Sequence, residues 1–327
     1  MSQRPRGPLS GWQPKTKRQK AILADVLEQF DALRSANLLP RSPRGVFYDL
    51  RPNGHGHGVI YLKRFKVNNK LPKLGPMEAD PKTVQEVMVL ARRAGIIPEN
   101  WVADARAPSP LMPATASGAE SEVRMIDARL GWLRLDRQDG QDVYVELWCE
   151  AEGIAPRLAL IARDYGVPVY PAGGFKGLKG KRAAGERVAG RAVPTIALHV
   201  GDYDKHGSWI FRSEAEDVAG WADDASLLDL DKFITRKEVV ELPTAEGEPL
   251  LRVQRLAVTD AQVEVGLVEL DHDGKAEAEA IPPAELDVIV RGALDRLLDR
   301  ARRRLVVAGE GDMRSEVRRL LAERWAS

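Results

Sequence analysis

Three acidic residues stand directly after two apolar runs of the sequence. Glu150 follows the run 143–149, while Asp202 and Asp204 follow the run 195–200. In an extended segment, i, i+2 spacing places both aspartates on one side of the chain. Mg²⁺ prefers carboxylate oxygens, so the three acids together predict a magnesium site. A single acid in such a place is more often a helix cap or a solvated residue.

The elements that must position these acids are strands. The two runs are rich in β-branched and aromatic residues, and 167–170 is a third short run of the same kind. Helical stretches separate them, which predicts an α/β fold with a parallel sheet and a ligand crevice at the carboxyl ends of its strands. Glu146 lies inside its run and Glu152 begins the next helix, so Glu150 is the better ligand candidate.

The charge is balanced overall but unevenly placed. With 49 basic and 48 acidic residues the net charge is +1, yet residues 1–20 contain six basic side chains and no acidic one. Residues 41–74 contain eight against Asp49, and 176–191 is basic and Gly-rich, which predicts a flexible loop. Such stretches can hold a phosphate backbone, although solvated loops have the same composition. We expect DNA contacts from Lys63, Arg64, Lys66, Lys176, Lys179 and Lys181.

Composition narrows the class of protein. A chain of 327 residues with 44% apolar and 30% charged residues is typical of about two globular domains. One cysteine, Cys149, excludes an internal disulfide framework and a multi-cysteine zinc site. No apolar run is long enough to span a bilayer, and the N-terminus has no apolar signal core. We therefore expect a cytoplasmic protein without a membrane partner.

Periodicity and helix breakers divide the chain into parts. Besides the strands above, we expect helices at about 22–37, 44–50, 84–95, 283–305 and 313–325 and strands at 59–65 and 262–269. The division is a basic tail at 1–20, a winged-helix-like domain at 21–106, a linker at 107–142, a metal-binding domain at 143–250, and a C-terminal part at 251–327 that completes this domain and adds helices.

Two motifs carry a family resemblance. Glu-Leu-Trp-Cys-Glu-Ala-Glu-Gly at 146–153 and Gly-Asp-Tyr-Asp-Lys-His-Gly at 201–207 resemble the signature pieces of a TOPRIM domain, the fold shared by topoisomerases, primases and certain nucleases. The second motif is similar to that of the DNA topoisomerase VI A subunit and its meiotic double-strand-break relatives. That family has a winged helix before the TOPRIM domain and a cleaving tyrosine in an Arg-x-x-aromatic-Tyr segment. Arg44 to Tyr48 has this pattern.

Further segments extend the resemblance to most of residues 22–300. They are 91–98, 103–106, 256–259 and 279–283, of which the first two resemble stand-alone phage and bacterial members. The stretch 51–77, which contains His55 and His57, does not align with the family; these histidines fit an exposed loop better than a role beside the phenol.

The resemblance implies a mechanism and partners. Tyr48 would attack double-stranded DNA, forming a 5′-phosphotyrosyl bond and releasing a 3′-hydroxyl, while Arg44 holds the phosphate and Glu150, Asp202 and Asp204 hold Mg²⁺. It also implies a homodimer associated with the nucleoid. The chain has no Gly-x-x-x-x-Gly-Lys-Ser/Thr loop, so ATP-coupled strand passage would need a separate ATPase partner.

Two other functions remain open. In a hydrolytic TOPRIM nuclease, similar to those of plasmid-defence systems, water would replace the tyrosine and Tyr48 would be incidental. In a DNA-binding structural subunit, the fold would be retained without turnover.

Overall fold

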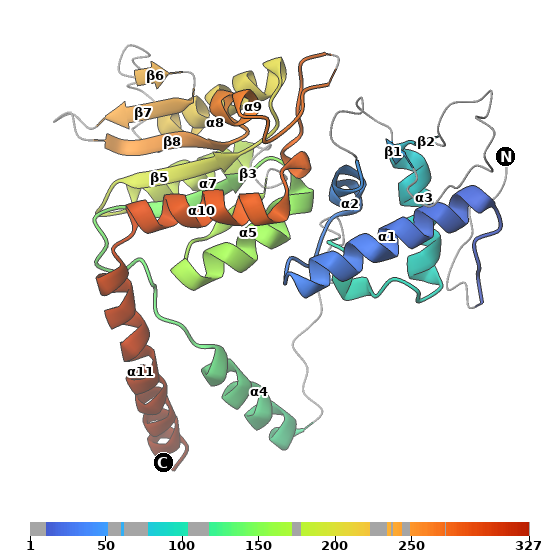
Figure 1. Cartoon of the computed structure of the whole chain (residues 1–327). Helices are drawn as coiled ribbons and strands as arrows, with labels where there is room; N and C mark the ends of the chain where they lie inside the picture. The colour runs from blue at the N-terminus through green and yellow to red at the C-terminus, as the bar shows by residue number, and fades with distance from the viewer. Residues whose placement is uncertain are drawn as a thin grey trace.

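The computed structural model describes residues 11–51, 60–61, 78–103, 118–171, 178–222, 234–236, 238–243, 249–271 and 273–326. The predicted α/β class is confirmed: a mostly parallel sheet is flanked by helices (Figure 1). No helix in these ranges is long and apolar enough to cross a membrane.

The described strands of the main sheet lie in the order β4-β3-β5-β8-β7-β6. The first four run parallel, and β7 and β6 continue the sheet antiparallel. Their bounds are Tyr144–Cys149 for β3, Val169–Pro171 for β4, Thr195–Val200 for β5, Ile234–Arg236 for β6, Val239–Pro243 for β7 and Pro249–Ala257 for β8.

Helices cover both faces of this sheet. On one face, α5 (Ala155–Ala162) and α10 (Pro283–Leu297) enclose a core that includes Leu147 and Leu158. On the other face, α7 (Leu178–Ala189) and α8 (Lys205–Ala222) pack over residues such as Trp148 and Val253. Strands β3 and β5 are buried on both faces, and this explains their nearly continuous apolar sequence.

An N-terminal module packs beside the carboxyl ends of the parallel strands (Figure 1). Its elements are α1 (Lys17–Ser35), α2 (Pro43–Asp49), β1 (Ile60–Tyr61), β2 (Glu78–Ala79), α3 (Pro81–Arg93) and η1 (Glu99–Trp101). The helices begin at side-chain caps, with Ser42 accepting from the backbone of Gly45 and Asp80 from that of Thr83. The three helices predicted for this part of the chain are thereby confirmed.

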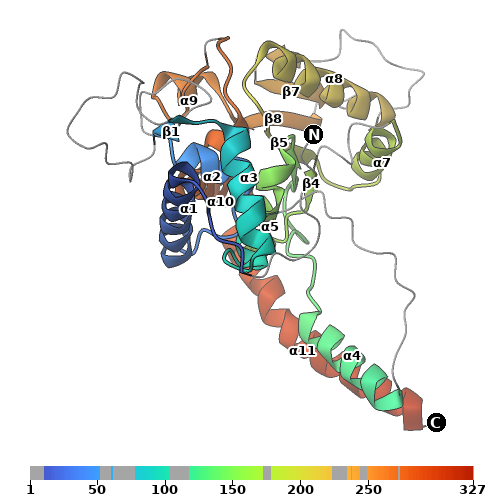
Figure 2. The same ribbon diagram turned by 90° about the vertical axis from the view of Figure 1, so that its right-hand side faces the viewer.

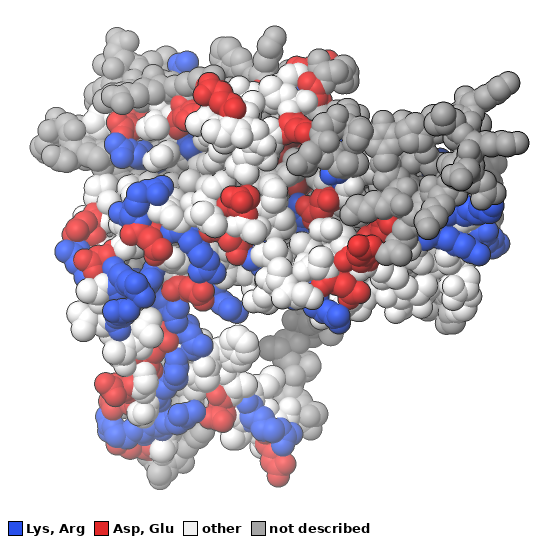
Figure 3. Space-filling view, viewed as in Figure 1, with Lys and Arg blue, Asp and Glu red and all other residues white. Residues whose placement is uncertain are grey.

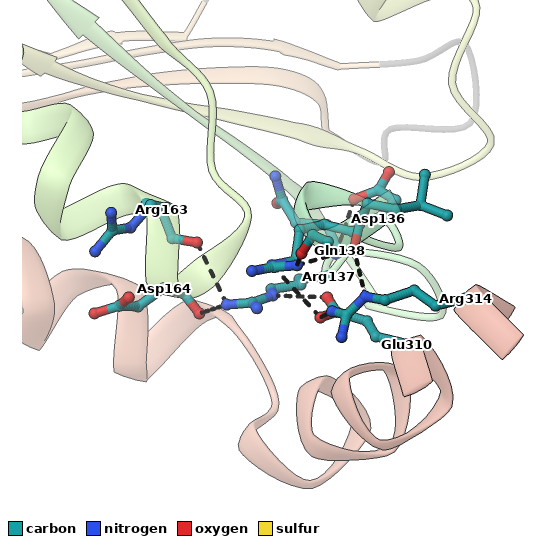
Figure 4. Close-up of polar contacts among 10 residues, drawn as sticks. Asp136, Arg137, Gln138, Arg163, Asp164, Glu310 and Arg314 are labelled. Atoms are coloured by element: carbon teal, nitrogen blue, oxygen red, sulfur yellow. Dashed lines mark hydrogen bonds and ion pairs between the residues drawn. The ribbon is translucent and has the colours of Figure 1, made fainter. Parts of the chain in front are cut away.

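Two helices form an arm that extends away from the body in both ribbon views (Figures 1 and 2). They are α4 (Ala119–Trp132) and α11 (Arg300–Ala326). The root of the arm is fixed by the buried Glu310, which accepts from Arg137 at 3.3 Å and from Arg314 at 3.1 Å (Figure 4). The remaining short elements are η2 (Glu152–Ile154), η3 (Arg163–Tyr165), α9 (Asp260–Glu264) and η6 (Ala278–Ala280).

Several predicted elements are wrong. The stretch 176–191, predicted to be a flexible loop, is largely helix α7. Gly185 serves close packing there, because an added Cβ would stand 2.9 Å from the backbone nitrogen of Ala222 in α8. The strand at 262–269 is replaced by α9, which begins at a Thr259–Gln262 capping box.

The remaining errors lie in the arm and at its root. The linker at 107–142 contains α4. The helix at 283–305 ends at Leu297, because the Asp299 carboxylate caps a new helix by accepting from the backbone of Ala301 and Arg302.

Candidate functional site

Strand register brings two of the predicted acids together. Cys149 lies opposite Val200 in the parallel β3–β5 pair, so the residues that follow them leave the sheet side by side. Glu150 donates its backbone N–H to Val200 at 2.8 Å, and its carboxylate accepts from the backbone N–H of Asp202 at 3.3 Å. Glu150 and Asp202 also line the same cavity, of about 1010 Å³.

The carboxylate of Asp202 lies in an acidic environment. It accepts a hydrogen bond from the backbone N–H of Ala278 at 2.8 Å. Burial raises the pKa of Asp202, and the negative charges of Glu277 and Asp204 add to this effect, whereas the Ala278 hydrogen bond opposes it. Asp204 is half-buried close enough to act electrostatically on Asp202, but it is not part of the described wall of the cavity.

Glu146 is separated from this site. Its side chain is fully buried and pairs with Arg191 at 2.9 Å and Arg187 at 3.3 Å, while the Trp148 indole N–H donates to it at 2.9 Å. These partners explain how a carboxylate can lie inside a strand. Glu152, by contrast, begins η2 and lines the cavity beside Glu150.

Arg255 on β8 holds the loop that carries Asp202. Its buried guanidinium donates to the carbonyl of Gly201 at 3.2 Å and to that of Asp202, and its Nε donates to Val258 at 2.8 Å. Burial lowers the pKa of Arg255, while Glu150 and Asp202 raise it. Sequence reasoning missed this residue, because an arginine inside a strand gives no local sign of such contacts.

Helix α2 brings the predicted nucleophile to the same region. Arg44 lines the cavity with Glu150 and Asp202, and its guanidinium forms an ion pair with Glu277. The Tyr48 side chain lies one turn further along α2, near the side chains of Glu277 and Arg44. Burial raises the pKa of Tyr48 and the nearby Glu277 carboxylate raises it further, whereas the Arg44 guanidinium lowers it. Tyr48 itself lines a neighbouring cavity of about 500 Å³.

The segment 276–281 connects helix α2 to the Asp202 loop. Ala276 and Tyr203 exchange two backbone hydrogen bonds of 2.7 and 2.9 Å, which fix one end of the segment. At the other end, Glu279 accepts from Ser42 at 3.1 Å through its side chain and from Arg41 at 3.1 Å through its carbonyl. Glu277 lies between these contacts. In the sequence, the only sign of a role for Glu277 was its position just before 279–283, a segment that extends the family resemblance.

The donor chemistry of the cavity suits a hard cation. Carboxylates of Glu150, Glu152, Asp202, Glu277 and Glu279 line it, against the guanidiniums of Arg44 and Arg92. Within the described ranges, however, no three His, Cys, Asp or Glu side chains stand close enough together to hold a metal ion as they are arranged. Glu150 and Asp202 are therefore the ligand pair that the geometry favours, with Asp204 nearby.

The predicted DNA contacts are only partly placed. Lys63, Arg64, Lys66 and Lys176 lie outside the described residues, and Lys179 belongs to α7 although its side chain is not described. Lys181 forms an ion pair with Asp217 across the α7–α8 contact. On the face shown in Figure 3, described basic and acidic side chains are interspersed, so no single basic face stands out there.

Comparison with known proteins gives no identification. No family model matches the chain, and neither a curated protein nor a solved structure matches it. The TOPRIM and topoisomerase VI resemblance therefore stays a prediction, and the site has to be judged by its own geometry.

Proposed function

We propose that this chain is a magnesium-dependent DNA-cleaving transesterase of the topoisomerase VI A type, with a winged-helix module and a TOPRIM domain. One observation carries the proposal: Arg44, Glu150 and Asp202 line one cavity, where the helix bearing Tyr48 meets the carboxyl ends of parallel strands. A cation and a carboxylate pair at this edge suit a phosphodiester beside a bound metal ion.

Each residue has a role in this mechanism. The planar guanidinium of Arg44 binds the DNA phosphate in place of Glu277, and the Tyr48 oxygen attacks the phosphorus. Glu150 and Asp202 would hold the ion, with Asp204 beside them, and Arg255 fixes the loop of Asp202. A bound Mg²⁺ would supply charge neutralisation for the departing 3′ oxygen. Double-stranded DNA is the proposed substrate, a homodimer the proposed assembly and an ATPase a proposed additional partner.

One observation favours the hydrolytic nuclease as a second candidate. Tyr48 lines the smaller cavity, whereas the acids line the larger one. If DNA occupied only the larger cavity, a water molecule would be the nearer nucleophile and Tyr48 would support the packing of α2.

Supercoiled plasmid incubated with the chain and MgCl₂, then quenched with detergent, tests the proposal. The transesterase gives linear DNA whose migration changes after protease treatment, because protein remains linked to the 5′ ends. Tyr48→Phe should abolish both the breaks and the protein-linked DNA. Breaks that persist in Tyr48→Phe would instead establish the nuclease.

Asp202→Asn distinguishes both enzymes from a structural subunit. We expect it to lose cleavage while its DNA affinity, measured by fluorescence anisotropy, stays within about twofold, because phosphate contacts supply most of the affinity. If the unmodified chain bound DNA but cut none with magnesium present, the structural subunit would be the better description.

Lys63, Arg64 and Lys66 test the expected DNA contact outside the described residues. Replacing all three by Ala should weaken binding equally for unrelated sequences and reduce the slope of log affinity against log salt by about two to three. Unchanged affinity and slope would show that these side chains do not touch DNA.

A further inference from the structure

Glu277 is placed where the proposed reaction needs a proton acceptor. Its carboxylate forms an ion pair with Arg44 and lies near the Tyr48 hydroxyl, so it adjoins both α2 residues assigned to the chemistry. It also lines the cavity that contains Glu150 and Asp202. Its side chain is 26% exposed, which leaves it accessible to an entering phosphate.

The backbone around Glu277 is fixed from both sides. Ala276 is bridged to Tyr203, and the N–H of Ala278 donates to Asp202 at 2.8 Å. Glu279 is held by Ser42 at the start of α2. A carboxylate between such contacts needs little reorganisation to face Tyr48, and this is the condition under which a positioned base is most effective.

A base is required because Tyr48 does not ionise by itself near neutral pH. Burial raises the pKa of Tyr48 and the negative charge of Glu277 raises it further, while the positive charge of Arg44 offsets only part of this rise. The proton therefore has to leave as the new O–P bond forms, to an acceptor within hydrogen-bonding distance.

Other carboxylates near α2 have different partners. Asp49 accepts from the buried Arg41 at 2.7 and 3.0 Å. Glu269 pairs with Arg51 at 3.3 Å, and Glu279 accepts from Ser42 at 3.1 Å. Among the described carboxylates, Glu277 has the largest effect on the pKa of Tyr48.

We propose that Glu277 is the general base that takes the Tyr48 proton during DNA cleavage, an inference that rests on the proposed function. The Tyr48 O–H bond breaks and its proton moves to the Glu277 carboxylate, while the Tyr48 oxygen bonds to phosphorus. The bond between phosphorus and the 3′ oxygen breaks, and this oxygen takes a proton from water. Arg44 moves from Glu277 to the phosphate in the same event.

Two substrates separate nucleophile activation from leaving-group stabilisation. One is a duplex containing a cleavage site mapped with the unmodified chain. The other is the same duplex with sulfur replacing the bridging 3′ oxygen at the scissile phosphate. A thiolate leaves far more readily than an alkoxide, since a thiol has a pKa of about 8.5. The measured quantity is the rate of protein–DNA adduct formation.

We expect Glu277→Gln to slow adduct formation on the normal duplex by about 100-fold or more, the usual contribution of a general base. Sulfur substitution should restore less than about tenfold of that loss, because nucleophile activation is still missing. Asp202→Asn should also slow adduct formation on the normal duplex. Most of its loss should be recovered on the sulfur substrate, because its defect lies at the leaving group. Glu269→Gln, a matched glutamate paired with Arg51 beside Tyr48, should stay within about threefold.

The outcomes distinguish the two proposals. If the unmodified chain forms no adduct, or if Tyr48→Phe still does, the transesterase itself is wrong and the base fails with it. If the adduct forms normally but Glu277→Gln reacts within threefold of the unmodified chain, or is fully restored by sulfur, only the role of Glu277 is overturned. Circular dichroism and thermal unfolding check each variant; should Glu277→Gln unfold, Glu277→Asp, which keeps a carboxylate, should show a loss of about tenfold.

Discussion

The carboxylate of Asp202 accepts a hydrogen bond of 2.8 Å from the backbone N–H of Ala278, 76 positions further along the chain. This bond ties the end of a parallel strand to a segment that also holds the start of α2 through Glu279 and Ser42. Three separate parts of the sequence therefore meet at the candidate site, and residues of α2 help to line both cavities.

Arg255 should be needed to keep the Asp202 loop in place. Arg255→Lys removes the fork that donates to Gly201, Asp202 and Val258, and we expect the free energy of unfolding to fall by about 3 kcal/mol, because buried carbonyls lose charged donors. Urea denaturation measures the change. Arg252→Lys on the same strand, whose partner Glu241 is retained, should change by less than about 1 kcal/mol.

Glu146 should stabilise the fold through its two arginine partners. In Glu146→Gln the half-buried Arg187 and Arg191 lose their shared, fully buried counter-charge, so the free energy of unfolding should fall by about 3 kcal/mol. Glu186→Gln, which removes an exposed pair with Arg182, should cost less than about 0.5 kcal/mol. If Glu146→Gln unfolded at the same urea concentration as the unmodified chain, its pairing would be energetically neutral.

The strands could be predicted because they depend on a local pattern of apolar residues. The closeness of Glu150 to Asp202 could be predicted because it depends on one topological rule of parallel sheets. The apolar runs of β3 and β5 specify buried parallel strands, and residues that follow neighbouring parallel strands must leave the same edge. Flanking proline and glycine residues likewise allowed α2 to be placed within one residue at either end.

The rest of the site depends on long-range contacts that no local pattern encodes. Glu277 meets Arg44 across 233 positions, and 276–281 has neither helical nor strand periodicity. Helix α4 was missed for a different reason: its residues are mostly exposed, with only Leu130 buried among them, so an apolar stripe that would reveal a helix is nearly absent.

Gly185 should be required by the packing of α7 against α8. Gly185→Ala places a methyl group against the Trp221 side chain and the adjoining backbone, and we expect a loss of about 1–3 kcal/mol in the free energy of unfolding. Gly311→Ala is the matched control, because that glycine lies in α11 with nothing within 4 Å of an added Cβ. It should stabilise the chain by about 0.5–1 kcal/mol. If both substitutions changed the free energy of unfolding by the same amount in urea denaturation, the result would contradict close packing at Gly185.

His199 should make stability fall as the solution becomes acidic. It is fully buried on β5 with its ring 5.1 Å from that of Phe211, and neither ring nitrogen has a hydrogen-bond partner in the described structure. Burial lowers the pKa of His199 to about 3, and the positive charge of Arg255 contributes. Because the unfolded chain binds this proton below about pH 6.5 and the folded chain does not, stability is complete above that pH and declines as the pH falls towards 3.

Between pH 7 and pH 5 this single group should remove about 2 kcal/mol of the free energy of unfolding. His199→Leu has no group to protonate, so its free energy of unfolding, measured in urea at both pH values, should fall by about 2 kcal/mol less than that of the unmodified chain. At pH 7 the variant should be no less stable, because two buried nitrogens without partners are replaced by apolar carbon. An equal fall in both proteins would mean that His199 is already protonated in the folded chain or accessible to solvent there.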